Sequence, residues 1–114
     1  MARRGDVLAV KRRLGFGSEG RVEHFVVLQA DVVQAALDTT IVVPLDDDLP
    51  LYEGDPLVVS VSAKEAGTRR GQVALVAHVL SVRIDRFEPT PVGKLKLVTL
   101  RSLEASARVI LDLP

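Results

Sequence analysis

The sequence of 114 residues lacks cysteine and tryptophan, and it has no apolar run near the ~20 residues that a membrane-spanning helix needs. Without cysteine there can be no thiolate zinc site, redox pair, cysteine nucleophile or disulfide framework. The first residues include Arg3, Arg4 and Asp6 rather than an apolar segment. We therefore expect a cytoplasmic chain with no export signal and no membrane anchor.

The sequence also lacks an overall charge, because 15 basic residues balance 15 acidic ones. A neutral molecule has no long-range attraction for nucleic acid, so any such binding must come from local patches. Basic residues cluster at positions 3–4, 11–13, 69–70 and 83/86, and positions 46–48 are three aspartates. Each basic cluster fits either a solvated rim or a phosphate contact. Aromatic residues make up only 4% of the chain, which leaves few rings for stacking unpaired bases.

Apolar residues, in contrast, make up 47% of the sequence, which is enough to form the core of a single domain spanning residues 1–114. Runs of apolar and β-branched residues bounded by Gly, Pro and Asp predict short strands. These strands cover residues 7–10, 25–28, 39–45, 57–62 and 73–82, with a weaker one within 89–96. Asp31 is predicted to cap a short helical turn that reaches residue 36.

The hydrophobic period changes near the C-terminus. Apolar residues recur with helical spacing from Leu100 to Leu111, and Thr99 precedes them as a candidate cap. One helix cannot cover both faces of a small apolar sheet, so we expect the sheet to curl into a barrel. The prediction is a mainly β (α+β) fold of five to seven strands with a short helix and a C-terminal helix. The apolar excess favours a homodimer.

Several short motifs occur in a fixed order along nearly the whole chain. They are Arg4-Gly5-Asp6-Val7, Gly17-Ser18-Glu19, residues 26–31, residues 40–45, residues 73–82, Val92-Gly93 and residues 109–113. In these motifs the sequence resembles the MazF/PemK family of toxins. The family fold is an SH3-like β-barrel with helices, shared with the gyrase poison CcdB, and the resemblance implies the same barrel here.

The resemblance also implies a function. Members of the family are toxins of type II toxin–antitoxin systems, usually homodimers, that are held inactive by a cognate antitoxin. They cut single-stranded RNA at selected sequences without a metal or other cofactor, by attack of the ribose 2′-hydroxyl on the adjacent phosphorus. That reaction needs a base for the 2′ proton, an acid for the departing 5′-oxygen and a cation or hydrogen-bond donor at the phosphorane.

Two positions depart from the family pattern. Glu23-His24 stand where the family has Arg-Pro, and Asp46 stands where it has Thr. The nearest guanidinium is that of Arg21, and because the loop before Glu23 is one residue shorter than in the family, Arg21 could swing into the place of the family arginine. A carboxylate about 4 Å from a phosphate costs on the order of 4 kcal/mol at an effective dielectric of 20. Either the aspartates at 46–48 bind Mg²⁺, or they form a solvated turn that does not face the substrate.

The candidate catalytic residues follow from the resemblance and from side-chain chemistry. His24 and His78 are candidates for base and acid, with Arg21 on the phosphate. Each histidine alone also fits a structural role, His78 as a half-buried strand residue and His24 as an exposed one. Glu19 either acts in the site or accepts hydrogen bonds from loop amides. The full set of candidates is Arg21, His24, His78, Glu19 and Glu23 for catalysis, and Arg12, Arg13, Gly17, Ser18 and Asp46 for RNA binding.

A second interpretation keeps the fold without the reaction. The substitutions at Glu23 and Asp46 favour a catalytically degenerate MazF- or CcdB-like protein that binds RNA, gyrase or an antitoxin. The C-terminal residues Leu113 and Pro114 do not match the Trp-Gly-Ile ending associated with CcdB. Cleavage of single-stranded RNA therefore remains the leading prediction.

Overall fold

A computed structural model describes residues 2–16 and 21–114. Within them, seven strands form one antiparallel sheet with the order β4-β5-β3-β2-β1-β7, and β6 pairs with β3. The strands are β1 (Asp6–Ala9), β2 (His24–Val27), β3 (Thr39–Asp46), β4 (Val59–Val61), β5 (Gln72–Ala74), β6 (Leu80–Arg83) and β7 (Gly93–Lys94). The helices are α1 (Asp31–Gln34), α2 (Ala63–Ala66) and α3 (Leu97–Leu111), with 3₁₀ turns η1 (Leu49–Tyr52), η2 (Val76–His78) and η3 (Ile84–Arg86). None of the helices in these two ranges is long and apolar enough to cross a membrane.

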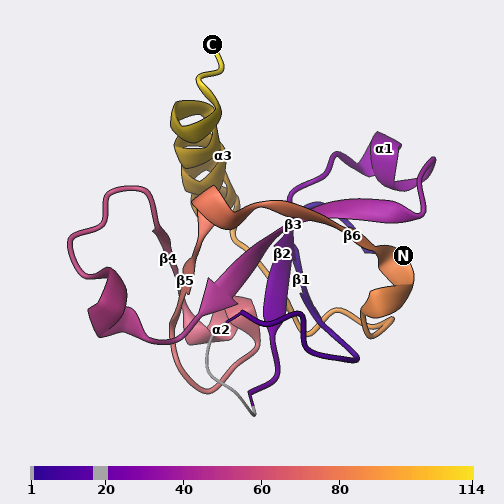
Figure 1. Cartoon of the computed structure of the whole chain (residues 1–114), viewed down its shortest axis with the longest axis horizontal. Coiled ribbons are helices and arrows are strands. Elements are labelled where there is room, and N and C mark those ends of the chain that lie inside the picture. The colour runs from indigo at the N-terminus through magenta and orange to yellow at the C-terminus, as the bar shows by residue number, and fades with distance from the viewer. Residues whose placement is uncertain (1, 17–20) are drawn as a thin grey trace.

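The long central strand β3 makes the sheet curl. Its first half pairs with β6, at Thr39 to Val42, and its last residues, Leu45 and Asp46, pair with β5. Its other edge pairs with β2 throughout the middle of the strand. Figure 1 shows the resulting half-barrel, with α3 against one side and its C-terminal end pointing away from the sheet. The predicted mainly β fold with a short helix and a C-terminal helix is confirmed.

The central strands are buried on both faces, which explains their continuous apolar sequences. Side chains alternate along a strand, so neighbouring residues enter different cores. Val26 and Val43 pack with Leu103 of α3, whereas Phe25 and Val42 enter a second cluster on the opposite face. All five residues are 0% exposed. The sheet thus supplies a rigid base for the loops at its edges.

The apolar segment 73–82, predicted as one strand, is divided into β5, η2 and β6. The two strands pair with different halves of β3, so the chain must turn between them. The Leu75 N–H donates to the Pro44 carbonyl at 2.9 Å just before this turn. His78 therefore lies on a 3₁₀ turn and is exposed, rather than half-buried on a strand.

Both predicted helix caps were wrong. Helix α3 begins at Leu97 after the N-cap residue Lys96, so Thr99 is inside its first turn. A distant carboxylate, that of Glu65, accepts the Lys96 N–H at 2.9 Å and takes over the capping role. Asp31 is the first residue of α1 and makes no cap bond. Its carboxylate accepts the Arg4 N–H at 2.7 Å instead, which ties α1 to the start of β1.

Helix α2 was missed, although its sequence carries a capping box. The Ser62 side chain accepts the Glu65 N–H at 3.2 Å, and the Glu65 carboxylate accepts the Ser62 N–H at 3.2 Å. Gly67 ends the helix in the left-handed conformation, with φ +71°. A Cβ atom at Gly93 would lie 2.2 Å from the Glu65 carbonyl oxygen. Helix α2 therefore packs directly against the backbone of β7.

Candidate functional site

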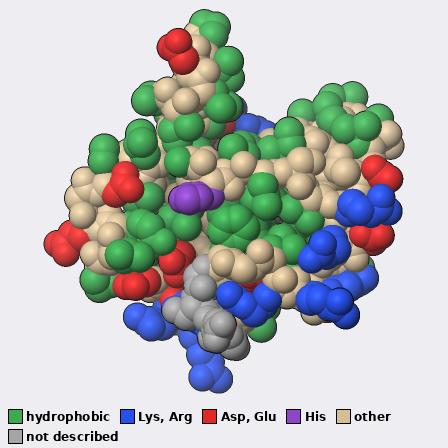
Figure 2. All heavy atoms as spheres, in the orientation of Figure 1, with side chains coloured by type: hydrophobic (Ala, Val, Ile, Leu, Met, Phe, Trp, Pro, Cys, Tyr) green, Lys and Arg blue, Asp and Glu red, His purple; other side chains and the backbone are tan. Residues whose placement is uncertain are grey.

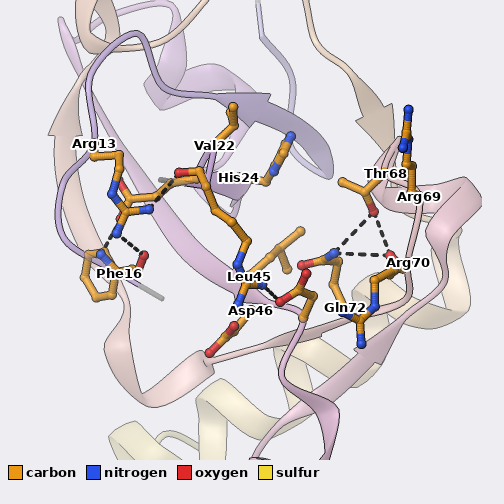
Figure 3. A pocket seen from close by; sticks show the side chains of 13 residues that line it. Arg13, Phe16, Val22, His24, Leu45, Asp46, Thr68, Arg69, Arg70 and Gln72 are labelled. Atoms are coloured by element: carbon orange, nitrogen blue, oxygen red, sulfur yellow. Dashed lines mark hydrogen bonds and ion pairs between the residues drawn. The ribbon is translucent and has the colours of Figure 1, made fainter. Parts of the chain in front are cut away.

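A pocket of about 300 Å³ opens where three loops meet. Its lining comes from the β1–β2 loop, from the end of β3 and from the turn between α2 and β5. Five of the predicted site residues line it, namely Arg13, Arg21, Glu23, His24 and Asp46. Figure 3 shows Arg13 and Phe16 on one side, Thr68, Arg69 and Arg70 on the other, and His24 and Asp46 between them.

The buried side chain of Glu23 binds the backbone of the β1–β2 loop. It is 4% exposed, and its two carboxylate oxygens accept the backbone N–H groups of Leu14 and Phe16. A buried carboxylate needs such donors, since an uncompensated charge is costly away from water. In the place where the family resemblance expects a guanidinium, the chain thus has an acidic side chain whose oxygens bind the loop.

Arg13 holds the same loop from another direction. Its guanidinium donates to the Arg21 carbonyl at 2.7 Å and to the Phe16 carbonyl at 3.0 Å. These two carbonyls lie on either side of residues 17–20. The predicted residues Gly17, Ser18 and Glu19 lie outside the described residues.

Arg21 and the aspartates at the end of β3 form the charged floor of the pocket. Arg21 makes an ion pair with Asp47. Asp46 is buried, at 8% exposure, and accepts the Tyr52 hydroxyl at 2.8 Å and the Asp48 N–H at 3.3 Å. Of the three aspartates only Asp48 is exposed, so the solvated turn that we considered for this run is not formed at Asp46 and Asp47.

The contact with Asp46 also affects Tyr52. Burial raises the pKa of Tyr52 to about 12, helped by the hydrogen bond to Asp46 and by the negative charges of Asp46 and Asp48. The neutral hydroxyl therefore remains a donor to Asp46 throughout the physiological range. Through this bond η1 is anchored to the end of β3.

The two histidines have different surroundings. His24 is half-buried at the start of β2 and lines the pocket with Arg21. Burial lowers its pKa, opposed by a hydrogen bond with the Val22 backbone, so its imidazole is mainly neutral near neutral pH. His78 is not among the described residues that line this pocket. Its ring lies edge-on to Phe16, with centroids 6.3 Å apart, and Phe16 itself lines the pocket.

Arg12 lies apart from the other predicted residues. It is exposed and borders a different hollow with Lys11, Asp85 and Arg86. Figure 2 shows basic side chains gathered along the lower and right-hand margins of one face, so the neutral chain has an uneven charge distribution. Among residues 2–16 and 21–114, no three His, Cys, Asp or Glu side chains are arranged to hold a metal ion.

Sequence reasoning missed four residues of this region. Tyr52 had no assigned role, Asp47 was considered only as part of the aspartate run, and the pair Arg69 and Arg70 was noted only as a basic cluster. Arg69 and Arg70 are about 50 positions from Arg21 in the sequence. The turn that carries them reaches the pocket through the pairing of β3 with β5. No local sequence pattern reports that proximity.

The fold is that of known toxin structures. The Mycobacterium tuberculosis toxin MazF-mt6 superposes with a TM-score of 0.76 at 16% identity, over 96% of this chain and 98% of that one. MazE–MazF of Deinococcus radiodurans gives a TM-score of 0.75 at 16% identity, over 99% of this chain and 97% of that one. An endoribonuclease in complex with its cognate antitoxin from a mycobacterial species gives 0.75 at 14% identity, over 99% and 95%.

The family follows from the sequence itself. Residues 3–111 match the family described as the PemK-like, MazF-like toxin of type II toxin–antitoxin systems. The chain therefore belongs to the MazF/PemK toxin family, as its motifs indicated. Among curated protein sequences, none matches this chain.

Proposed function

We propose that this chain is the toxin of a type II toxin–antitoxin pair and acts as a sequence-selective, metal-independent endoribonuclease on single-stranded RNA in the cytoplasm. The observation that carries the proposal is the pocket that unites Arg21 with a half-buried histidine, His24. Family membership and the fold shared with solved toxins support it. The proposed partners are a cognate antitoxin, a second copy of the chain and the RNA.

In this proposal His24 is the base. Its lowered pKa keeps the imidazole neutral, so its free ring nitrogen can accept the ribose 2′ proton. The 2′-oxygen then forms a bond to phosphorus as the bond to the 5′-oxygen breaks, which leaves a 2′,3′-cyclic phosphate and a 5′-hydroxyl. His78, beside Phe16, is proposed as the acid that protonates the leaving 5′-oxygen.

Arg21 is proposed to stabilise the phosphorane. Its guanidinium already pairs with a carboxylate oxygen of Asp47, and a phosphate offers anionic oxygens of the same kind. Substrate binding would exchange Asp47 for the phosphate. Glu23 and Arg13 are proposed to position the loop, and Asp46 to anchor the end of β3. Glu19 is proposed for catalysis, and Gly17 and Ser18 for RNA contacts.

The ion pair between Arg21 and Asp47 also favours the second candidate, a catalytically silent protein that binds RNA, gyrase or an antitoxin. If Asp47 keeps the guanidinium in the bound state, Arg21 cannot stabilise the phosphorane. The two candidates differ in whether Arg21 leaves its partner.

Cleavage of a long, end-labelled RNA by the antitoxin-free protein tests the proposal. We expect discrete cuts in EDTA with 2′,3′-cyclic ends, and a loss of about 10²–10³-fold on Arg21→Ala and about 10²–10⁴-fold on His24→Ala and His78→Ala. The acid limb of the rate profile should lie below pH 6.5, the ordinary histidine value, because His24 must be neutral. Arg83→Ala, an exposed arginine paired with Asp38 and Asp85, is the control. No cuts from the folded protein would favour the silent binder, and cuts only with Mg²⁺ would contradict the metal-independent mechanism.

A further inference from the structure

The turn between α2 and β5 has a fixed backbone. The Thr68 hydroxyl donates to the Arg70 carbonyl at 2.8 Å. The Gln72 amide, on a residue that is 8% exposed, donates to the same carbonyl at 3.1 Å and to the Thr68 hydroxyl at 3.3 Å. These bonds use the backbone of Arg70, and both Arg69 and Arg70 are exposed. The turn therefore presents two guanidinium groups at the rim of the pocket, across from Arg13 (Figure 3).

The formal charge of the pocket depends on this turn. Among the described lining residues other than the turn, Arg13 and Arg21 stand against the carboxylates of Glu23, Asp46 and Asp47. That part carries one net negative charge and would repel a phosphate. Arg69 and Arg70 reverse the balance to one net positive charge. The excess positive charge of the described lining therefore lies on this turn.

We propose that Arg69 and Arg70 form a phosphate clamp that binds the backbone phosphates next to the cleaved one and so positions the RNA over Arg21 and His24. The inference rests on the proposed RNA substrate. Arginine suits the task, because its planar fork binds phosphate oxygens in pairs and stays charged. A flexible polyanion is preferred to an acidic protein segment, since the same pocket contains the groups proposed to act on a phosphate.

Equilibrium binding of an RNA with 2′-O-methyl groups at every ribose measures the clamp without cleavage. The double substitution R69A/R70A should reduce the slope of log affinity against log salt by about 0.7 for each lost phosphate contact, or about 1.4 in total. Affinity should fall about tenfold or more at moderate salt. The matched control is R83A/R108A, which removes the same charge from two exposed sites outside the pocket, and it should leave the slope unchanged.

Substrate length locates the contact. On a long RNA, R69A/R70A should raise KM about tenfold with little change in kcat. This is the pattern expected when the lost contacts bind the substrate and the transition state equally well. A dinucleotide with only the scissile phosphate should be cut equally by the variant and the original protein. Unequal cutting of the dinucleotide would overturn the flanking-phosphate assignment.

The remaining outcomes separate the clamp from the proposed function. An unchanged slope in R69A/R70A, with cleavage intact in the original protein, overturns the clamp alone. Equal slope changes in R69A/R70A and R83A/R108A also overturn it, because they report only overall charge. A normal slope combined with weaker antitoxin binding assigns the turn to a protein interface and overturns the clamp.

A reduced slope in a protein that binds but never cuts RNA supports the clamp and contradicts the ribonuclease. Absence of RNA binding in the original protein contradicts both.

Discussion

Two buried glutamates illustrate the difference between the scaffold and the pocket. Glu65, 7% exposed, binds the backbone of α2 and the start of α3, and Glu23, 4% exposed, binds the backbone of the β1–β2 loop. Each satisfies backbone N–H groups that the fold would otherwise leave unpaired. Both glutamates have a structural role. Glu65 connects packed elements, whereas Glu23 supports a loop that lines a pocket.

The surroundings of the two glutamates differ. Around Glu65, Gly67 and Gly93 allow two backbones to approach so closely that a Cβ atom at either position would clash. Around Glu23, the neighbouring contact is an ion pair between the side chains of Arg21 and Asp47, and the Arg21 side chain is 40% exposed. The scaffold contact is thus between backbones, whereas the pocket contact is between charged side chains.

The largest effect should come from Gly93→Ala, on the scaffold side. The added Cβ atom would lie 2.2 Å from the Glu65 carbonyl oxygen and 2.7 Å from the Ala66 carbonyl carbon. Backbone atoms cannot move away cheaply, so we expect unfolding free energy to fall by about 3 kcal/mol or more. Thermal or urea unfolding measures it.

Gly54→Ala is the matched control. Gly54 has φ +80° and no atom within 4 Å of the added Cβ, so only backbone strain of about 1–2 kcal/mol is expected. Equal losses for the two variants would show that the close contact between α2 and β7 is unimportant.

On the pocket side, Glu23→Ala should lower RNA cleavage by about 10²-fold, because misplacement of a site by about 1 Å has that effect. The substitution removes the acceptors of the Leu14 and Phe16 amides. Phe16 is then no longer held in position in the lining of the pocket. Hydrogen exchange at these two amides should accelerate. Glu88→Ala, at an exposed glutamate, is the control. A loss of cleavage without faster exchange would show that Glu23 acts in the chemistry directly.

Glu65→Gln should have a moderate, pH-dependent effect. Burial acts to raise the Glu65 pKa, but hydrogen bonds from Lys96, Thr99 and Ser62 lower it below the ordinary 4.5. The ionised form is thus favoured in the folded state, so its stabilisation is full above pH 4.5 and is lost as the pH falls through the lower, folded value. We expect a difference of about 1–2 kcal/mol near neutral pH, from the cap and its charged hydrogen bonds.

Denaturant unfolding at a series of pH values checks the sign. The gap between Glu65→Gln and the original protein should narrow as the pH falls below 4.5. A gap that widens in acid would mean that the folded state favours the protonated carboxyl.

The fold could be predicted from the sequence because buried residues form local patterns of apolar side chains. Val26 and Val43 belong to runs that only a sheet covered on both faces can hold, and Leu103 lies on a helical stripe. The start of α3 was misjudged because its cap is Glu65, which is distant in sequence. The undivided strand at 73–82 was wrong because the change of partner along β3 is a property of the whole sheet.

The site was harder to predict because its contacts depend on loop shape and topology. A glutamate where the family has arginine suggested a charge beside the phosphate, yet Glu23 turns toward the loop amides. Arg69 reaches the pocket only through the register of β5 on β3. Such contacts leave no periodic pattern that a single sequence can show.

The smallest effect concerns the anchor between Tyr52 and Asp46. The chain has one tyrosine and no tryptophan, so phenolate absorbance reports Tyr52 alone. We expect the titration midpoint of Tyr52 to be about 12 in the folded protein. Circular dichroism, recorded at each pH, detects any unfolding. Because the folded state favours the neutral hydroxyl, stability should decrease as the pH rises from 10.0 toward that value.

Asp46→Asn should lower the Tyr52 midpoint toward 10.0, because it removes the charge and the charge-assisted hydrogen bond, although burial keeps the pKa above that value. The control Asp55→Asn, at an exposed aspartate that bonds only its own turn, should leave it unchanged. An unchanged midpoint in Asp46→Asn would show that burial and the charge of Asp48, without Asp46, determine the Tyr52 pKa. In that case Asp46 would not be committed to the scaffold, and its carboxylate would instead be available to the ligand in the pocket.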